Sequence, residues 1–93
     1  MTQLKDILTP VFYKNRVKKA VLFGSYSKGN ATAHSDVDLL VDSGLRGLAF
    51  FGLVDDVCET LKCDVDLIDI HDVIPDSKVD REIRDTGIVI YEQ

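Results

Sequence analysis

Two alternating pairs of aspartates are the residues of this sequence best suited to chemistry. Asp36 and Asp38 stand one residue apart in SDVDLLV, and Asp64 and Asp66 repeat the spacing in CDVDLID. Because side chains alternate across a strand, each pair would place two carboxylates on one face, where like charges repel. Carboxylate oxygens are preferred ligands of hard divalent cations, so one or two such ions would compensate the repulsion.

Spacing alone does not decide this interpretation. The chain has 13 aspartates, so roughly two Asp-x-Asp pairs are expected by chance. The placement is more informative, because both pairs stand inside stretches that are otherwise apolar and Asp is depleted in strands. The alternative is a solvated sheet face that holds no metal.

A short polar loop before the first pair has the composition of a phosphate-binding turn. Gly24 follows an apolar stretch directly, and a residue without a side chain lets backbone N–H groups approach an anion. Ser25 adds a hydroxyl donor, and Lys28 adds a positive charge. A helical turn beginning there would add its dipole. Gly-Ser turns are common, so the prediction of a phosphate site rests on the position of this loop directly before the strand that carries Asp36.

These residues need a layered scaffold. The hydrophobic spacing predicts strands and helices that alternate along the chain: strands at 20–23, 36–41, 63–70 and 88–91, and helices at 2–14, 50–61 and 78–86. We expect Pro10 to kink or shorten the first helix. Ser77 is the expected cap of the last helix, and Gly87 its left-handed end. The order predicts an α+β (α/β layered) fold, a small mixed sheet of about four strands with helices packed on one face.

Composition narrows the function classes. The net charge of −5 argues against nonspecific binding to nucleic acid, which needs a cationic face. No apolar run is long enough to span a bilayer, and the N-terminal residues are too polar for a secretory signal, so we expect a cytoplasmic protein that does not enter membranes. A basic cluster precedes the first strand and is interpreted as solvated surface, with a partner site as the alternative: Lys14, Arg16, Lys18 and Lys19.

The cysteines and histidines give weak signals. Cys58 falls on the apolar side of its helix and is expected in the core, and neither it nor Cys63 has metal-type spacing. His34 and His71 are isolated in sequence and are interpreted as loop residues, with a ligand or substrate contact as the less favoured alternative for His34, which stands next to the first aspartate pair.

Three segments together resemble a known family. They read Gly24-Ser-Tyr-Ser-Lys-Gly29, Ser35-Asp-Val-Asp-Leu-Leu-Val41 and Val65-Asp-Leu-Ile68. This combination is similar to the minimal nucleotidyltransferases of the DNA polymerase beta superfamily, whose usual pattern is Gly-Ser-x-Ala-Arg-Gly, Ser-Asp-x-Asp-Leu and a later aspartate. The resemblance covers the chain, and implies a single domain over residues 1–93 with the polymerase-beta-type fold.

The resemblance implies roles for the carboxylates. Asp36 and Asp38 would bind two Mg²⁺ ions, with Mn²⁺ as a substitute. Asp66 would be the third catalytic and metal-binding carboxylate and would help to activate the attacking hydroxyl. Asp64 has no family counterpart.

It also implies an ATP site. Gly24 and Ser25 would hold the β- and γ-phosphates of ATP, with Lys28 beside them. Lys28 replaces the arginine of the family pattern, and Ser27 its alanine. Lysine keeps the charge but lacks the planar fork of arginine, so the phosphate contact would be weaker.

The implied function is transfer of AMP from ATP to a hydroxyl acceptor. A chain this short leaves no residues for a separate acceptor-binding domain, so we expect the acceptor on a partner protein, in the manner of an antitoxin that acts on a helical HEPN-type toxin. The alternative is a non-catalytic antitoxin that neutralises the partner by binding it. A degenerate module with a dead site is disfavoured by the intact Asp36, Asp38 and Asp66. Association with further copies of the chain stays open.

Overall fold

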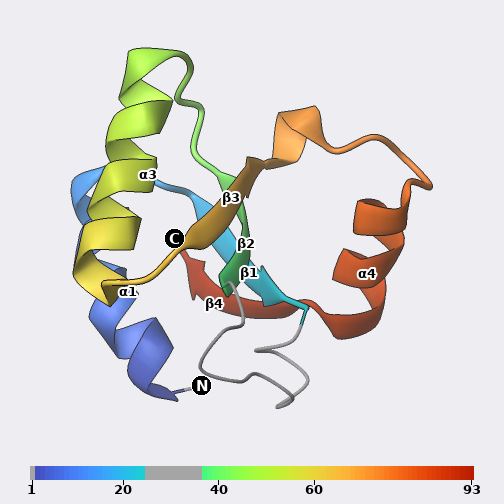
Figure 1. Cartoon of the computed structure of the whole chain (residues 1–93), viewed down its shortest axis with the longest axis horizontal. Coiled ribbons are helices and arrows are strands. Elements are labelled where there is room, and N and C mark those ends of the chain that lie inside the picture. The colour runs from blue at the N-terminus through green and yellow to red at the C-terminus, as the bar shows by residue number, and fades with distance from the viewer. Residues whose placement is uncertain (1, 25–36) are drawn as a thin grey trace.

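The computed structural model describes residues 2–24 and 37–93, and Ser25, Lys28 and Asp36 lie outside these ranges. The elements run in the order α1 (Thr2–Lys14), β1 (Lys19–Phe23), β2 (Val37–Asp42), α3 (Leu48–Leu61), β3 (Val65–Asp69), the 3-10 helix η1 (Ile70–Asp72), α4 (Lys78–Thr86) and β4 (Ile88–Glu92) (Figure 1).

The strands form one mixed sheet in the order β3-β2-β1-β4. β1 is antiparallel to β2 and to β4, whereas β2 and β3 are parallel. Parallel neighbours need a crossover connection, and α3 supplies it between β2 and β3. The predicted four-strand mixed sheet is confirmed.

One face of the sheet carries the hydrophobic core. Alternate residues of the strands point to this face and meet α1 and α3, as period-two alternation requires. The fully buried side chains are Leu8, Phe12, Val17, Ala20, Leu22, Val37, Leu39, Val41, Leu53, Val57 and Ile90. α1 and α3 therefore form the helical layer that the sequence predicts.

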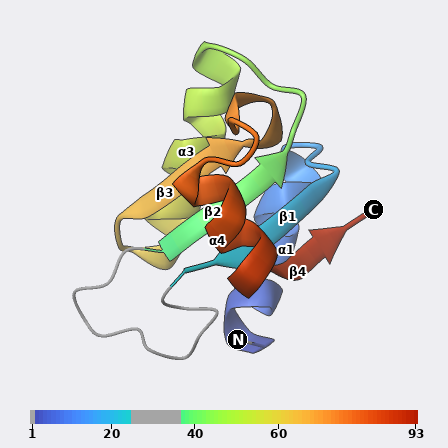
Figure 2. The same ribbon diagram turned by 90° about the vertical axis from the view of Figure 1, so that its right-hand side faces the viewer.

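The third helix differs from that layering. α4 lies in front of the sheet in Figure 2, with α1 and α3 behind it. Its Ile83 faces Val21 and Leu40 across a cavity of about 170 Å³. α4 takes this position because its C-terminal end continues directly into β4, whose pairing with β1 holds it beside the sheet.

Two local expectations are wrong, the shortening of the first helix at Pro10 and the burial of Cys58 in the core, whereas a kink at Pro10 stays a prediction. Pro10 does not shorten α1, which continues to Lys14. The carbonyl that Pro10 leaves without an N–H partner belongs to Asp6, and both residues are exposed to water, while Leu8 and Phe12 anchor the helix on either side of the proline. Cys58 is half-buried rather than part of the core.

The end of α4 corrects a third expectation. Ser77 is the N-cap, since its hydroxyl accepts the Asp80 N–H at 3.2 Å. Gly87, however, has an extended backbone, φ −64° and ψ 133°, and the prediction of a left-handed cap is wrong. Glycine fits there for a packing reason. A Cβ would collide with the carbonyl oxygen of Ile83 and lie 3.0 Å from Val21 Cγ1.

Candidate active site

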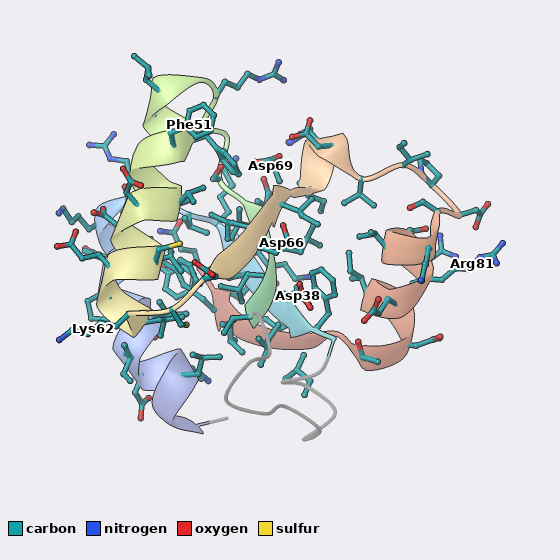
Figure 3. All side chains as sticks on the ribbon, in the orientation of Figure 1. Asp38, Phe51, Lys62, Asp66, Asp69 and Arg81 are labelled. Carbon is teal, nitrogen blue, oxygen red and sulfur yellow. The ribbon has the colours of Figure 1, made fainter. Side chains whose placement is uncertain are left out.

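Asp38 and Asp66 lie side by side on neighbouring strands. The parallel register of β2 and β3 pairs them directly, and adjacent strands are about 4.8 Å apart. Both side chains belong to the face turned away from the core and toward α4 (Figure 3). Asp38 is half-buried and Asp66 is exposed. The sheet thus brings together two of the three carboxylates that the sequence singled out.

This pair fits the oxygen ligands that Mg²⁺ takes, because two carboxylates on one face can share an ion. Within residues 2–24 and 37–93, no three His, Cys, Asp or Glu side chains form a group that could hold a metal ion. Asp36, the remaining predicted ligand, lies outside these ranges. Asp64, which the family resemblance leaves without a role, is exposed just before β3.

Gly24 meets Asp38 at the end of β1. Its backbone has φ +77°, and a Cβ built on it would lie 2.5 Å from Asp38 Oδ2 and 3.3 Å from Glu82 Oε1. A positive φ and such a close approach both favour glycine. The start of the predicted phosphate loop, the carboxylate of β2 and the inner side of α4 therefore converge at one point.

The Gly24 backbone is also tied to α4. Its N–H donates to Thr86 Oγ1 at 3.0 Å, and the Thr86 hydroxyl donates to the carbonyl of Glu82 at 2.8 Å. The Gly24 N–H, one of the backbone donors expected to approach phosphate, is thus already hydrogen-bonded within the protein. The expected contacts of Ser25 and Lys28 with phosphate stay predictions, since both residues lie outside the described structure.

Sequence reasoning missed Glu82 and Thr86. Their proximity to Gly24 depends on which side of α4 faces the sheet. Val79 and Ile83, four residues apart, mark an apolar side on this otherwise polar helix, and this spacing is a signal for that orientation. The antiparallel pairing of β1 with β4 brings that end of α4 to Gly24, and the sequence alone does not establish this pairing.

A second polar group occupies the opposite end of β2 and β3. Asp69, 6% exposed, accepts hydrogen bonds from the Ser43 hydroxyl at 3.0 Å and the His71 N–H at 2.9 Å. Its other near contact is His71 Nδ1, also at 2.9 Å. Burial by itself would raise the pKa of the Asp69 carboxyl, but these hydrogen bonds and the neighbouring imidazole hold the pKa below its ordinary value.

This group joins three segments at the far edge of the sheet. The Ser43 hydroxyl also accepts the Leu45 N–H at 3.1 Å, so Asp69 organises both the turn after β2 and η1. An open pocket of about 600 Å³ lies beside it, between the start of α3 and η1. His71, predicted as an isolated loop residue, is instead part of η1 and paired with Asp69. An aspartate side chain often accepts from the backbone N–H two residues later, so the Asp69-x-His71 spacing was a signal for this turn in the sequence.

Comparison with known proteins now identifies the family. The sequence profile described as "Polymerase beta, Nucleotidyltransferase" matches residues 5–93. The chain belongs to the polymerase beta nucleotidyltransferase family. The predicted resemblance and fold are confirmed.

Relatives of this nucleotidyltransferase include three proteins of Methanocaldococcus jannaschii. "Putative protein adenylyltransferase MJ0128" is 31% identical over an alignment of 96 positions that covers 97% of each chain. "Putative protein adenylyltransferase MJ0435" is 31% identical over 78 residues, which cover 81% of this chain and 83% of that protein. The match to "Putative protein adenylyltransferase MJ0604", 43% identical over 49 residues, covers 53% of this chain and only 45% of that protein.

Solved structures show the same fold. A chain in the crystal structure of a toxin–antitoxin with AMP-PNP superimposes with a TM-score of 0.78 at 26% identity, over 96% of this chain and 73% of that chain. A chain in the complex of tri-AMPylated Shewanella oneidensis HEPN toxin with MNT antitoxin gives a TM-score of 0.72 at 24% identity, over 100% of this chain and 74% of that one, and supports the fold alone.

None of the described helices of this nucleotidyltransferase has the length and apolar character that crossing a membrane requires.

Proposed function

We propose that this chain, as one minimal nucleotidyltransferase domain over residues 1–93, transfers AMP from ATP to a hydroxyl of a partner protein. The observation that carries the proposal is the pairing of Asp38 with Asp66 on parallel strands, beside the Gly24 turn, in a member of a nucleotidyltransferase family. Asp36, Asp38 and Asp66 are the proposed catalytic and metal-binding carboxylates, and Gly24, Ser25 and Lys28 the proposed nucleotide-binding residues.

The reaction forms one bond and breaks one. The acceptor oxygen attacks the α-phosphorus of ATP, the bond from that phosphorus to the bridging oxygen of the β-phosphate breaks, and pyrophosphate leaves. Asp66 is the exposed member of the pair, and in this proposal its carboxylate takes the proton of the acceptor hydroxyl. When bound, Mg²⁺ supplies charge neutralisation and alignment for this in-line displacement. Asp38 lies on β2, which pairs with β1 and with β3, so the sheet holds its carboxylate beside that of Asp66.

A protein acceptor suits this chain better than a nucleic acid. The net charge of −5 and the paired carboxylates would repel a polyanion. Relatives with 31% identity are named protein adenylyltransferases. The similar solved chains come from complexes of a toxin with its antitoxin, one of them with AMP-PNP. We therefore propose a HEPN-type toxin as the partner and an antitoxin role for this nucleotidyltransferase.

Labelled nucleotide tests the reaction directly. The chain is co-expressed with the product of the adjacent gene, purified, and incubated with Mg²⁺ and α-³²P-ATP, followed by intact-mass measurement. We expect label on the partner and a mass increase of one or more AMP units, both lost with Asp38→Asn. Label found only on RNA or a small molecule would overturn the protein acceptor, and no transfer in any fraction would overturn the enzyme.

Neutralisation by binding alone is the second candidate. Leu48 is 88% exposed and Phe51 64% exposed at the start of α3, so apolar surface remains on this helix. A stable complex with an unmodified partner, equally tight for wild type and Asp38→Asn, would favour this candidate over transfer.

A further inference from the structure

The contact between Gly24 and Thr86 follows from the register of the sheet. β1 and β4 are antiparallel, and their pairing places Leu22 opposite Ile88. Continued by two residues along each strand, the same register places Gly24 opposite Thr86. The regular ladder has ended at that point, and Thr86 Oγ1 accepts the Gly24 N–H at 3.0 Å in place of a backbone carbonyl.

The Thr86 hydroxyl is oriented for this role. A hydroxyl has a single proton to donate, and Thr86 donates it to the carbonyl of Glu82 at 2.8 Å. That bond fixes the proton along α4, so the lone pairs of Oγ1 are left to accept from Gly24. Both hydrogen bonds are partly buried, where losing an acceptor is more costly than in open solvent.

The end of α4 holds Thr86 in a fixed place relative to β1. The Gly87 N–H donates to the carbonyl of Ile83 at 2.8 Å, and Gly87 packs so closely on Val21 that a Cβ would be 3.0 Å from its Cγ1. β4 then begins at once and pairs with β1. Thr86 is therefore set by strand pairing on one side and helix packing on the other.

We propose that Thr86 is a positioning residue for nucleotide binding. Its hydroxyl holds the Gly24 backbone at φ +77° against the Asp38 carboxylate, and so fixes the conformation of Gly24 at the end of β1. This inference rests on the proposed function, because Gly24 is a proposed nucleotide-binding residue. It adds a part of the site contributed by the C-terminal helix.

The chain contains a matched control. Thr9 Oγ1 donates to the Lys5 carbonyl at 2.7 Å, the same bond to the residue four positions earlier, on the exposed side of α1. Thr9→Val and Thr86→Val both replace a hydroxyl with a methyl group of similar size. Only Thr86→Val also removes the acceptor of the Gly24 N–H. Thr86→Ser keeps the hydroxyl and serves as the conservative variant.

Two measurements on the full chain test the proposal. Calorimetry with ATP and Mg²⁺ should show binding weakened roughly 3- to 10-fold by Thr86→Val, the range expected for one lost hydrogen bond. Thr86→Ser should restore the wild-type affinity to within about twofold, and Thr9→Val should leave it unchanged. By NMR, hydrogen exchange of the Gly24 amide, slow in wild type and Thr86→Ser, should become faster in Thr86→Val.

Each result of these measurements either supports or overturns the role of Thr86. If folded Thr86→Val binds ATP as tightly as wild type, or if Thr9→Val weakens binding equally, Thr86 does not position the site. The wild-type chain provides a check even if Thr86→Val unfolds: a Gly24 amide that exchanges as fast as an exposed amide overturns the proposal. If wild type binds no ATP while Gly24 exchange still responds to Thr86→Val, the proposed function fails and the anchoring contact stands.

Discussion

The Asp38 carboxylate lies so close to the Cα of Gly24 that no side chain fits between them. A Cβ on Gly24 would be 2.5 Å from Asp38 Oδ2, and the backbone there has φ +77°. The carboxylate and the turn are therefore a single steric unit: a residue larger than glycine must displace one of them. This coupling joins the two motifs that the sequence presents as separate.

Gly24→Ala should damage both stability and activity. The methyl group meets Asp38, and the positive φ strains any L side chain, so we expect a loss of about 1–3 kcal/mol in the free energy of unfolding. AMP transfer should be lost because Asp38 moves. Urea unfolding and the labelled-ATP assay measure the two effects.

Gly52→Ala is the matched control for that variant. Gly52 lies within α3, and a Cβ there would have no heavy atom within 4 Å. Alanine at a helix interior should stabilise by about 0.5–1 kcal/mol and leave transfer intact. A Gly24→Ala protein as stable and active as Gly52→Ala would contradict the packing described for Asp38.

The paired carboxylates should make ligand binding visible as thermal stabilisation. With Mg²⁺ and ATP at about 100 times Kd, the folded state gains about 2.7 kcal/mol, which corresponds to an increase in Tm of at least about 10 °C for a domain of this size. Asp38→Asn should abolish that increase and reduce transfer by at least about 100-fold.

Without ligand, removal of one carboxylate of the pair should not lower Tm. Asp66→Asn removes one of two like charges that face each other across β2 and β3, so Tm without ligand should stay equal or rise. Asp55→Asn, on the exposed side of α3, should change neither apo Tm nor the response to ATP. An apo Asp66→Asn protein that melts well below Asp55→Asn would show that the pair does not repel.

Much of the fold was predictable because its signals are local. The alternation in Val37, Leu39 and Val41 specifies a strand with one buried face, and the spacing of Leu53 and Val57 places α3 against it. Strand neighbours are not local. That Asp66 stands beside Asp38 depends on a parallel crossover, which the family resemblance implies and residue spacing cannot show.

The unpredicted features share a physical cause. Thr86 reaches Gly24, and Asp69 binds Ser43, across separations of 62 and 26 residues. Such pairs are set by sheet register and helix orientation, which depend on the whole packing arrangement. At Gly87 a local signal was present but gave the wrong prediction. A glycine at a helix end favours a left-handed cap in sequence, but close contact with Ile83 and Val21 decides its conformation.

Gly87 and Gly44 should therefore respond differently to asparagine. Gly44 has φ +69° with open space around it, so Gly44→Asn should cost less stability than Gly44→Ala, because asparagine tolerates the left-handed region. At Gly87 any Cβ collides with the Ile83 carbonyl, so Gly87→Asn and Gly87→Ala should both destabilise, with no advantage to asparagine. Urea unfolding of the four variants tests this. A clear rescue by asparagine at Gly87 would support the left-handed cap after all.

The hydrogen bonds to Asp69 should make stability depend on pH in the acid range. The pKa of this carboxyl in the folded state is below its ordinary value of 3.8, because the hydrogen bonds from His71 and Ser43 outweigh the effect of burial. A lowered folded-state pKa favours the native state above pH of about 4, and the contribution is lost as pH falls through the folded-state pKa. Ser43→Ala removes one donor to a buried charge, so it should cost about 1–3 kcal/mol at pH 7 and less as the pH falls toward the folded-state pKa, at pH 3 for example, because protonation of Asp69 removes the charge that the hydroxyl stabilises. Ser77→Ala is the control, since it removes a serine that caps α4 by accepting the Asp80 N–H; it should cost about 1 kcal/mol at both pH values. Urea unfolding at the two pH values measures all three proteins, and equal losses for Ser43→Ala at pH 7 and pH 3 would show that the Ser43 hydroxyl does not stabilise the charged form of Asp69.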